Sequence, residues 1–153
     1  MRLRTAAAGA IAAFALNWIW ENAQAPLYMG YAGFAREVWM CTVATAGDLV
    51  IIAAIWVVVA MAWRDPAWHR RGTPSRTASA AVAGLAIAVA VEYWALDTGR
   101  WAYETMPLVP FTRIGLMPVL QMIFIPPLVF ALMRRCERRS RSTPVSRAPV
   151  HGG

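Results

Sequence analysis

The chain has 153 residues, of which 59% are hydrophobic and only 15% are charged, which is the size of one domain and a composition typical of a membrane protein. All 15 basic residues are arginine and the formal net charge is +7. Because the arginines gather at the ends of apolar segments, they indicate orientation in a membrane and argue against nucleic-acid binding.

Four apolar segments are long enough to cross a bilayer, which takes about 20 helical residues. They cover residues 5–25, 40–63, 77–97 and 114–133. We therefore predict an all-α integral membrane protein in which residues 1–136 form a four-helix transmembrane bundle. Residues 137–153 are rich in Arg, Ser and Pro, which predicts a disordered basic tail in the cytoplasm.

The first apolar segment also has features of a cleaved signal peptide. A basic start precedes it, and Ala23-Gln24-Ala25 matches the small-x-small cleavage pattern. Trp18, Trp20 and Glu21, however, stand where small residues are expected, and Pro26 would follow the cut. We therefore interpret this segment as the first membrane span and leave cleavage as the open alternative.

The arginines also predict which side of the membrane each loop occupies. They are concentrated at the N-terminus, in the loop between the second and third spans, and in the tail, whereas the opposite side holds only Arg36, Arg100 and Arg113. Because cytoplasmic loops are enriched in arginine and lysine, both termini are predicted to be cytoplasmic. The expected location is the bacterial cytoplasmic (inner) membrane, with multiple passes.

Three acidic residues lie within the predicted spans: Glu21, Asp48 and Glu92. A charge inside a bilayer is costly, so such residues normally face protein, water or a partner. Counted from the ends of their helices at 1.5 Å per residue, all three lie in the outer half of the membrane. This common depth predicts one polar layer inside the bundle.

Residues of the same helix faces extend this layer. Asn17 lies one turn from Glu21 on a stripe of small residues, and Glu92 ends a similar stripe of Ala80, Gly84 and Ala88. Small residues allow helices to approach closely in lipid. We predict Asp48, Glu92 and Glu21 as catalytic candidates. The predicted ligand-binding residues are Asn17, Thr45, Gln121, Arg100, Trp101, Tyr103 and Trp94.

A purely structural interpretation of the layer stays open. Polar side chains hydrogen-bond membrane helices together, typically for about 0.6–2 kcal/mol each, and Glu21 and Glu92 are close enough to the outer surface to pair with Arg100 or Arg113. The sequence predicts no metal site or cofactor, because Cys41 and Cys136 are expected on opposite sides of the membrane and neither histidine has a neighbouring ligand.

Part of the chain resembles a known family. The segment Gly99–Tyr103 (GRWAY), then Met106-Pro107, and then Pro118–Phe124 (PVLQMIF) is similar to the small polytopic lycopene cyclase domains, over about a third of the chain. Leu120 and Gln121 stand where that family has paired acids. The resemblance therefore implies an isoprenoid ligand whose protonating acid would be Asp48, Glu21 or Glu92. The layout more distantly resembles the four-helix sterol isomerase and sigma-2 receptor group, which also implies a lipidic ligand.

From these features we expect an outward-facing pocket of carboxylates and aromatic residues that binds, or converts by acid–base chemistry, an isoprenoid or other lipidic ligand. The expected partners are membrane lipids and this apolar ligand, with a homo-oligomer left open. One alternative is a small proton-coupled transporter, although residues 49–62 offer no polar step for a conducting path. The other alternative is a non-catalytic membrane assembly subunit.

Overall fold

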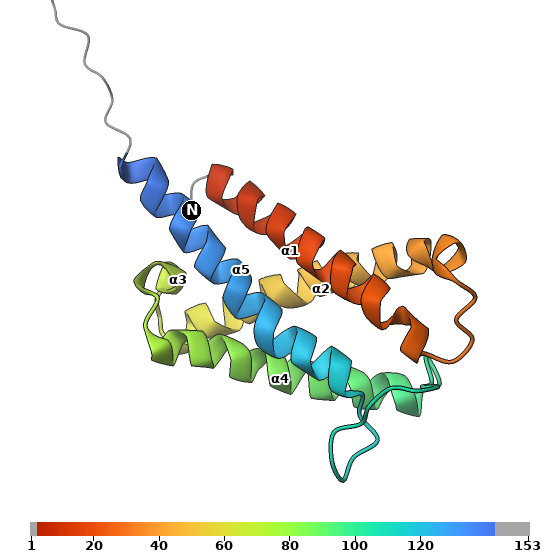
Figure 1. Ribbon diagram of the computed structural model, residues 1–153. Coiled ribbons are helices and arrows are strands. Elements are labelled where there is room, and N and C mark those ends of the chain that lie inside the picture. Colours follow the sequence, from red (N-terminus) through yellow and green to blue (C-terminus); the bar gives the residue numbers. More distant parts are fainter. Residues whose placement is uncertain (1–2, 143–153) are drawn as a thin grey trace, which may run out of the picture.

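A computed structural model describes residues 3–142 of the chain (Figure 1). The described part is α-helical and contains no β-strand. Its elements in chain order are α1 (Leu3–Gln24), the short 3-10 turn η1 (Ala25–Leu27), α2 (Phe34–Ala62), α3 (Trp68–Arg71), α4 (Pro74–Asp97) and α5 (Leu116–Ser142). Two loops, 25–33 and 98–115, lie at the opposite end of the bundle from α3 (Figure 1); we call the two ends the loop end and the α3 end.

Three of these helices are long and apolar enough to cross a membrane: α2, α4 and the Leu116–Arg139 part of α5. Their length and hydropathy support the prediction of a membrane protein. Helix α1 has 22 residues but is not among the three, and it carries polar residues near both of its ends. A fourth span and the orientation of the termini therefore remain predictions.

Two helices are longer than the apolar pattern indicates. Helix α2 begins at Phe34, directly after Gly33 with its φ of 100°, six residues before the predicted span. Helix α5 continues through Ser142, so residues 137–142, which the sequence pattern assigned to the disordered tail, are helical. Packing explains this extension, because Glu137 is buried against α3. Residues 143–153 of the predicted tail lie outside the described part.

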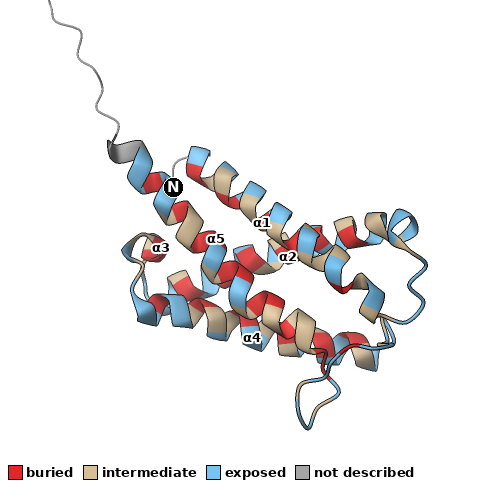
Figure 2. Cartoon of the chain, in the orientation of Figure 1, coloured by how far each residue is buried: buried red, intermediate tan, exposed pale blue. Residues whose placement is uncertain are grey.

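The four long helices pack in a ring, in which α5 contacts α1 and α4, and α2 contacts the same two helices (Figure 1). Buried residues form stripes along the facing sides of the helices (Figure 2). The small-residue faces predicted on α1 and α4 are among these stripes, which confirms them as packing faces. At Gly84, the backbone of α4 approaches the Met122 carbonyl of α5 so closely that a Cβ atom would collide with it.

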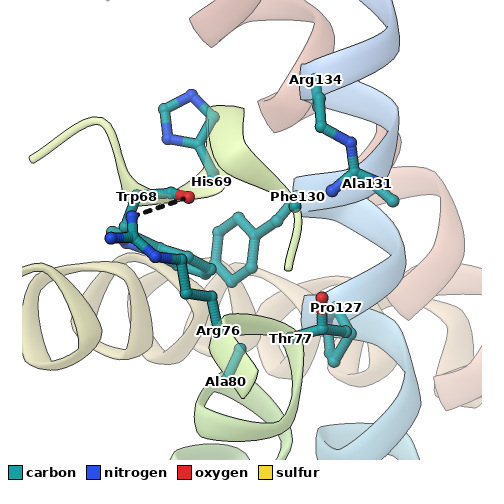
Figure 3. Close-up of a pocket in the computed structure, with 10 residues that line it drawn as sticks. Trp68, His69, Arg76, Thr77, Ala80, Pro127, Phe130, Ala131 and Arg134 are labelled. Atoms are coloured by element: carbon teal, nitrogen blue, oxygen red, sulfur yellow. Dashed lines mark hydrogen bonds between the residues drawn. The ribbon is translucent and has the colours of Figure 1, made fainter. Parts of the chain in front are cut away.

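The half of the bundle toward α3 is filled by apolar side chains. Its most deeply buried members are Ile55, Val59, Ala80 and Val129, with Phe130 and Trp68 at the α3 end. Figure 3 shows this end, where the rings of Trp68 and Phe130 meet with their centroids 4.9 Å apart. The space enclosed there is only about 10 Å³, roughly enough for one water molecule.

Ionic and aromatic contacts fasten the α3 end. Arg76 of α4 donates to Asp65 at 2.6 Å and to the Trp68 carbonyl at 3.4 Å, as Figure 3 shows for the second bond, and the Arg76 hydrogen bond holds the pKa of Asp65 below its usual value. Arg70 reaches the buried Glu137 of α5 at 2.8 Å. These contacts clamp the loop between α2 and α4 onto α5.

His69 gives this clamp a predictable pH dependence. Its buried ring accepts a hydrogen bond from the Trp56 indole at Nδ1, at 3.4 Å, and burial lowers its pKa, although Glu137 opposes the shift. The folded state therefore binds fewer protons at His69 than the unfolded state does, and stability falls as the pH drops below about 6.5. We expect the melting temperature of the wild-type protein to be lower at pH 5.5 than at pH 7.5, and this difference to be smaller in His69→Gln. The same difference in the wild-type protein and in His69→Gln would show that His69 is not responsible.

Candidate functional site

The amide of Gln121 is the centre of a buried polar cluster at the level predicted for the polar layer. Its Nε2 lies 3.0 Å from Asn17 Oδ1, 3.0 Å from Glu21 Oε1 and 2.9 Å from Asp48 Oδ2. Its carbonyl oxygen accepts from Gln24 Nε2 at 3.2 Å, and the same nitrogen of Gln24 donates to Glu21 at 2.8 Å. One side chain of α5 thus connects α1 and α2.

The Gln121 amide nitrogen has more acceptor neighbours than hydrogens to donate. An NH2 group has two hydrogens, whereas three acceptor oxygens surround Gln121 Nε2. The two carboxyl oxygens, of Glu21 and Asp48, are at most 5.9 Å apart because both contact this one nitrogen. A proton on one carboxyl group could be donated to the other, which would join Glu21 to Asp48 directly and remove the repulsion between two like charges.

Glu92 occupies a second, separate polar position on α4. It is buried, and its Oε2 accepts a hydrogen bond from the Tyr103 hydroxyl. The backbone N–H of Gly115 donates in turn to the Tyr103 oxygen at 3.1 Å. The loop between α4 and α5 therefore folds back to hold the Glu92 side chain in place.

Above these carboxyl groups lies a cavity of about 690 Å³, a volume within the range of small-molecule sites. Its walls come from the loop-end halves of α1, α2, α4 and α5 and from the loops above them. Apolar side chains such as Ile51, Val91 and Met122 line much of it, and Glu21, Asp48, Glu92 and Gln121 also reach it. The cavity thus has polar groups on apolar walls.

Three aromatic residues of the loops 25–33 and 98–115 cover the loop end of the cavity, and we call them the roof: Tyr28, Trp101 and Tyr103. Tyr28 and Tyr103 pair as an isolated antiparallel bridge with their rings 5.5 Å apart, and Tyr28 also meets the edge of Trp101 at 6.3 Å. Burial and the nearby charges of Glu92, Glu21 and Asp48 raise the pKa of Tyr28, so its hydroxyl stays protonated. The buried indole nitrogen of Trp101 lacks a hydrogen-bond partner of good geometry among the described residues.

The charges around the cavity are unbalanced. Four carboxyl groups line it, including Glu37 in the first turn of α2, whereas Arg100 is the one arginine among its lining residues. Arg100 is exposed and stacks over the Trp94 ring at 4.9 Å. Carboxylates and aromatic faces both attract cations, so the cavity favours a ligand that carries, or develops, positive charge.

The structure brings most of the residues singled out from the sequence to this cavity. Glu21, Asp48, Glu92, Gln121, Trp94, Arg100 and Trp101 line it. Asn17 lies behind Gln121, and Tyr103 holds Glu92. Thr45 is fully buried but donates to the Cys41 carbonyl of its own helix and is not part of the cavity wall.

The observed contacts of Arg100 and Arg113 differ from the pairs with Glu21 and Glu92 that the purely structural interpretation of the sequence expected. Arg113 pairs with Asp97 at the surface, while Arg100 stacks on Trp94, and within residues 3–142 neither arginine forms an ion pair with Glu21 or Glu92. Glu21, Asp48 and Glu92 are therefore held by amide and hydroxyl groups.

Sequence reasoning missed or undervalued several residues of the site. Gln24 bridges Glu21 and Gln121, and Glu37, Cys41 and Tyr31 line the cavity. Gln24 continues the four-residue stripe of Asn17 and Glu21, which was the available signal for it. Glu37 and Tyr31 lie outside the apolar segments, and no spacing connects them to the polar layer.

No group of three histidine, cysteine or acidic side chains in the described part of the chain lies in an arrangement that would hold a metal ion. Comparison with known proteins found no match: no protein family fits the chain, and none of the curated proteins or solved structures matched it.

Proposed function

We propose that this chain is a four-span inner-membrane protein with cytoplasmic termini whose cavity binds an isoprenoid or related lipidic ligand and exchanges protons with it. The observation that carries the proposal is the pair of carboxyl groups, Glu21 and Asp48, that share the Gln121 amide below an apolar cavity. Helix α1 completes the bundle beside α2 and α5. Membrane lipids surround the protein as its partners.

The carboxyl pair would act as the acid. One proton shared between Glu21 and Asp48 is transferred to a carbon of a double bond, which leaves a carbocation on the neighbouring carbon and both carboxyl groups of the pair ionised. Their two negative charges and the faces of the roof aromatics stabilise the cation. Gln121 and Asn17 orient the two carboxyl groups and take no proton themselves.

Glu92 would act as the base. Loss of a proton from a carbon next to the cation re-forms a double bond at a new position, and the Glu92 carboxylate accepts that proton. The proton then returns to the pair, so the reaction is an isomerisation that consumes no other reactant. The Tyr103 hydroxyl holds Glu92 in position between turnovers.

The apolar core distinguishes this function from proton-coupled transport. Below the Gln121 cluster, the described core contains apolar side chains such as Ile52, Ile55 and Val129. The buried polar residues beyond them lie toward the α3 end: Thr5, His69, Arg76 and Glu137. The polar groups of the cavity are thus separated by apolar packing from the ionic clamp at the α3 end. A pocket that opens at one end of the bundle fits this arrangement better than a path through it.

A stable cation tests the proposed chemistry. An N,N-dimethyldodecylammonium ion places a positive charge on an apolar chain, whereas dodecanol has the same chain without charge. We expect the purified protein to bind the ammonium about tenfold more tightly than the alcohol, a difference of about 1.4 kcal/mol. Asp48→Asn should abolish this preference, with binding measured by isothermal titration calorimetry in neutral detergent.

Asp97→Asn is the matched control. It also removes one carboxylate at the loop end, but Asp97 is exposed, pairs with Arg113 and does not line the cavity. It should retain the preference for the ammonium ion. Equal affinity for ammonium and alcohol in the wild-type protein, or loss of the preference in Asp97→Asn as well, would contradict the proposed role of the carboxyl pair.

A further inference from the structure

The cavity has a mouth on the side of the bundle. Four residues of α2, Met40, Val43, Ala44 and Gly47, line the cavity and are also exposed. They recur at three- or four-residue spacing and thus form one stripe, next to the buried stripe of Cys41, Thr45 and Asp48.

Helix α4 forms the other edge of this mouth. Val91 and Trp94 line the cavity, and Trp94 is 51% exposed. In Figure 1, α2 and α4 diverge toward the loop end, whereas Trp63 and Ser79 join them by a hydrogen bond of 3.1 Å at the α3 end. The cavity therefore opens between the loop-end halves of these two helices.

The surroundings of this mouth are set by the helices that form it. Both α2 and α4 are long and apolar enough to span a membrane, so their exposed faces meet lipid chains. From Met40 to Gly47 the mouth extends roughly 10 Å along α2, at 1.5 Å per residue. It thus reaches from the interfacial level of Trp94 into the hydrocarbon.

We infer that the ligand enters the cavity sideways from the bilayer, through the opening between α2 and α4, and is a membrane-resident isoprenoid chain and not a water-soluble compound. This inference rests on the proposed function and specifies its substrate class and route. The apolar chain keeps to hydrocarbon along the α2 stripe. Its double bonds then reach Asp48, which lies one residue beyond Gly47 on α2 at the deep end of the mouth.

Gly47 offers a way to close the mouth without disturbing the fold. A Cβ atom at this position meets nothing within 4 Å, so a larger side chain fits the helix and projects into the opening. Gly47→Leu should plug the mouth. Gly47→Ala tests the effect of a Cβ alone, and Ala46→Leu adds the same bulk on an exposed neighbour that does not line the cavity.

The probe is all-trans-retinol, an isoprenoid alcohol that accepts tryptophan fluorescence and is delivered in phosphatidylcholine vesicles. Trp94 and Trp101 line the cavity and serve as donors. We expect saturable energy transfer from tryptophan to retinol in the wild-type protein. The rate at which retinol enters the cavity, followed by the growth of this transfer, should be at least tenfold lower in Gly47→Leu. Gly47→Ala should fall between the wild type and Gly47→Leu, and Ala46→Leu should differ from the wild type by less than twofold.

An engineered disulfide across the roof tests the competing route, in which the ligand enters the cavity from water between the loops 25–33 and 98–115. Met29 and Ala102 are both exposed and are joined by a backbone hydrogen bond of 2.9 Å between these two loops. A disulfide in Met29→Cys/Ala102→Cys would fix these loops together, and reduction would release them. Lateral access predicts the same retinol rate with the disulfide closed or reduced.

The outcomes separate this inference from the proposed chemistry. A rate lowered by the roof disulfide but not by Gly47→Leu would overturn lateral access, as would the absence of saturable transfer in the wild-type protein. Neither result depends on the preference for an ammonium ion. If the wild-type protein shows no preference for the ammonium ion but Gly47→Leu still slows the entry of retinol, the acid–base role is refuted and the lateral route stands.

Discussion

Replacing Gln121 with methionine is expected to lower the free energy of unfolding by about 3–5 kcal/mol, because leaving a buried polar group without its partner costs about 1–3 kcal/mol, and more if it is charged. The variant keeps the length of the side chain but removes its amide. Asn17, Glu21, Gln24 and Asp48 would each lose a hydrogen bond to residue 121. Denaturation in mixed micelles, followed by circular dichroism, measures the loss.

Leu128→Met provides the control for this substitution. Leu128 lies on the same helix, is 46% exposed and belongs to neither the polar cluster nor the core, so the change should be within about 0.5 kcal/mol. A loss below about 1 kcal/mol in Gln121→Met would show that the buried acids find other partners and that the amide is not their organising centre.

Gly84→Ala is expected to destabilise the fold by about 3 kcal/mol or more, which is the upper range for overpacking a tight contact. The added methyl group would collide with the Met122 carbonyl oxygen of α5. Because that atom belongs to the backbone, it cannot rotate away, so α4 and α5 must separate. The two helices carry Glu92 and Gln121, so the cavity should distort as well. The same denaturation experiment measures the effect.

Gly47→Ala is the matched comparison, because it makes the same chemical change in a helix with open space around the Cβ position. There the methyl group should be neutral or stabilise by about 0.5–1 kcal/mol, the ordinary advantage of alanine over glycine within a helix. Similar behaviour of the two variants would contradict the close approach of α4 and α5 at Gly84.

The amino-acid pattern predicted the helical class and most of the polar layer for one physical reason. In a chain this apolar, an acid within a helix must face the interior, so spacing alone places Glu21, Asp48 and Glu92 on inward faces. The stripes that end at Glu21 and Glu92 were predicted as contacts because small residues permit close packing. The sequence could not show that Gln121 lies beside both Glu21 and Asp48, because that depends on the rotation of α5 against α1 and α2.

The sequence could not predict the contacts within the roof or at the α3 end, for a different reason. Tyr28 meets Tyr103 across 75 residues of chain, and Glu137 is buried because Arg70 and His69 lie against it. Neither contact follows a helical period, so the pattern gave no sign of them, and the charged end of α5 was predicted as a disordered tail.

By itself, the sequence determined that the protein is a bundle of membrane-type helices with acids facing inward, since hydropathy and periodicity act within single helices. Tertiary structure alone decided that two of these acids share one amide, that the third is held apart by Tyr103, and that the cavity above them opens between α2 and α4. Those features depend on distances between helices and on how the loops 25–33 and 98–115 fold back, which no local pattern encodes.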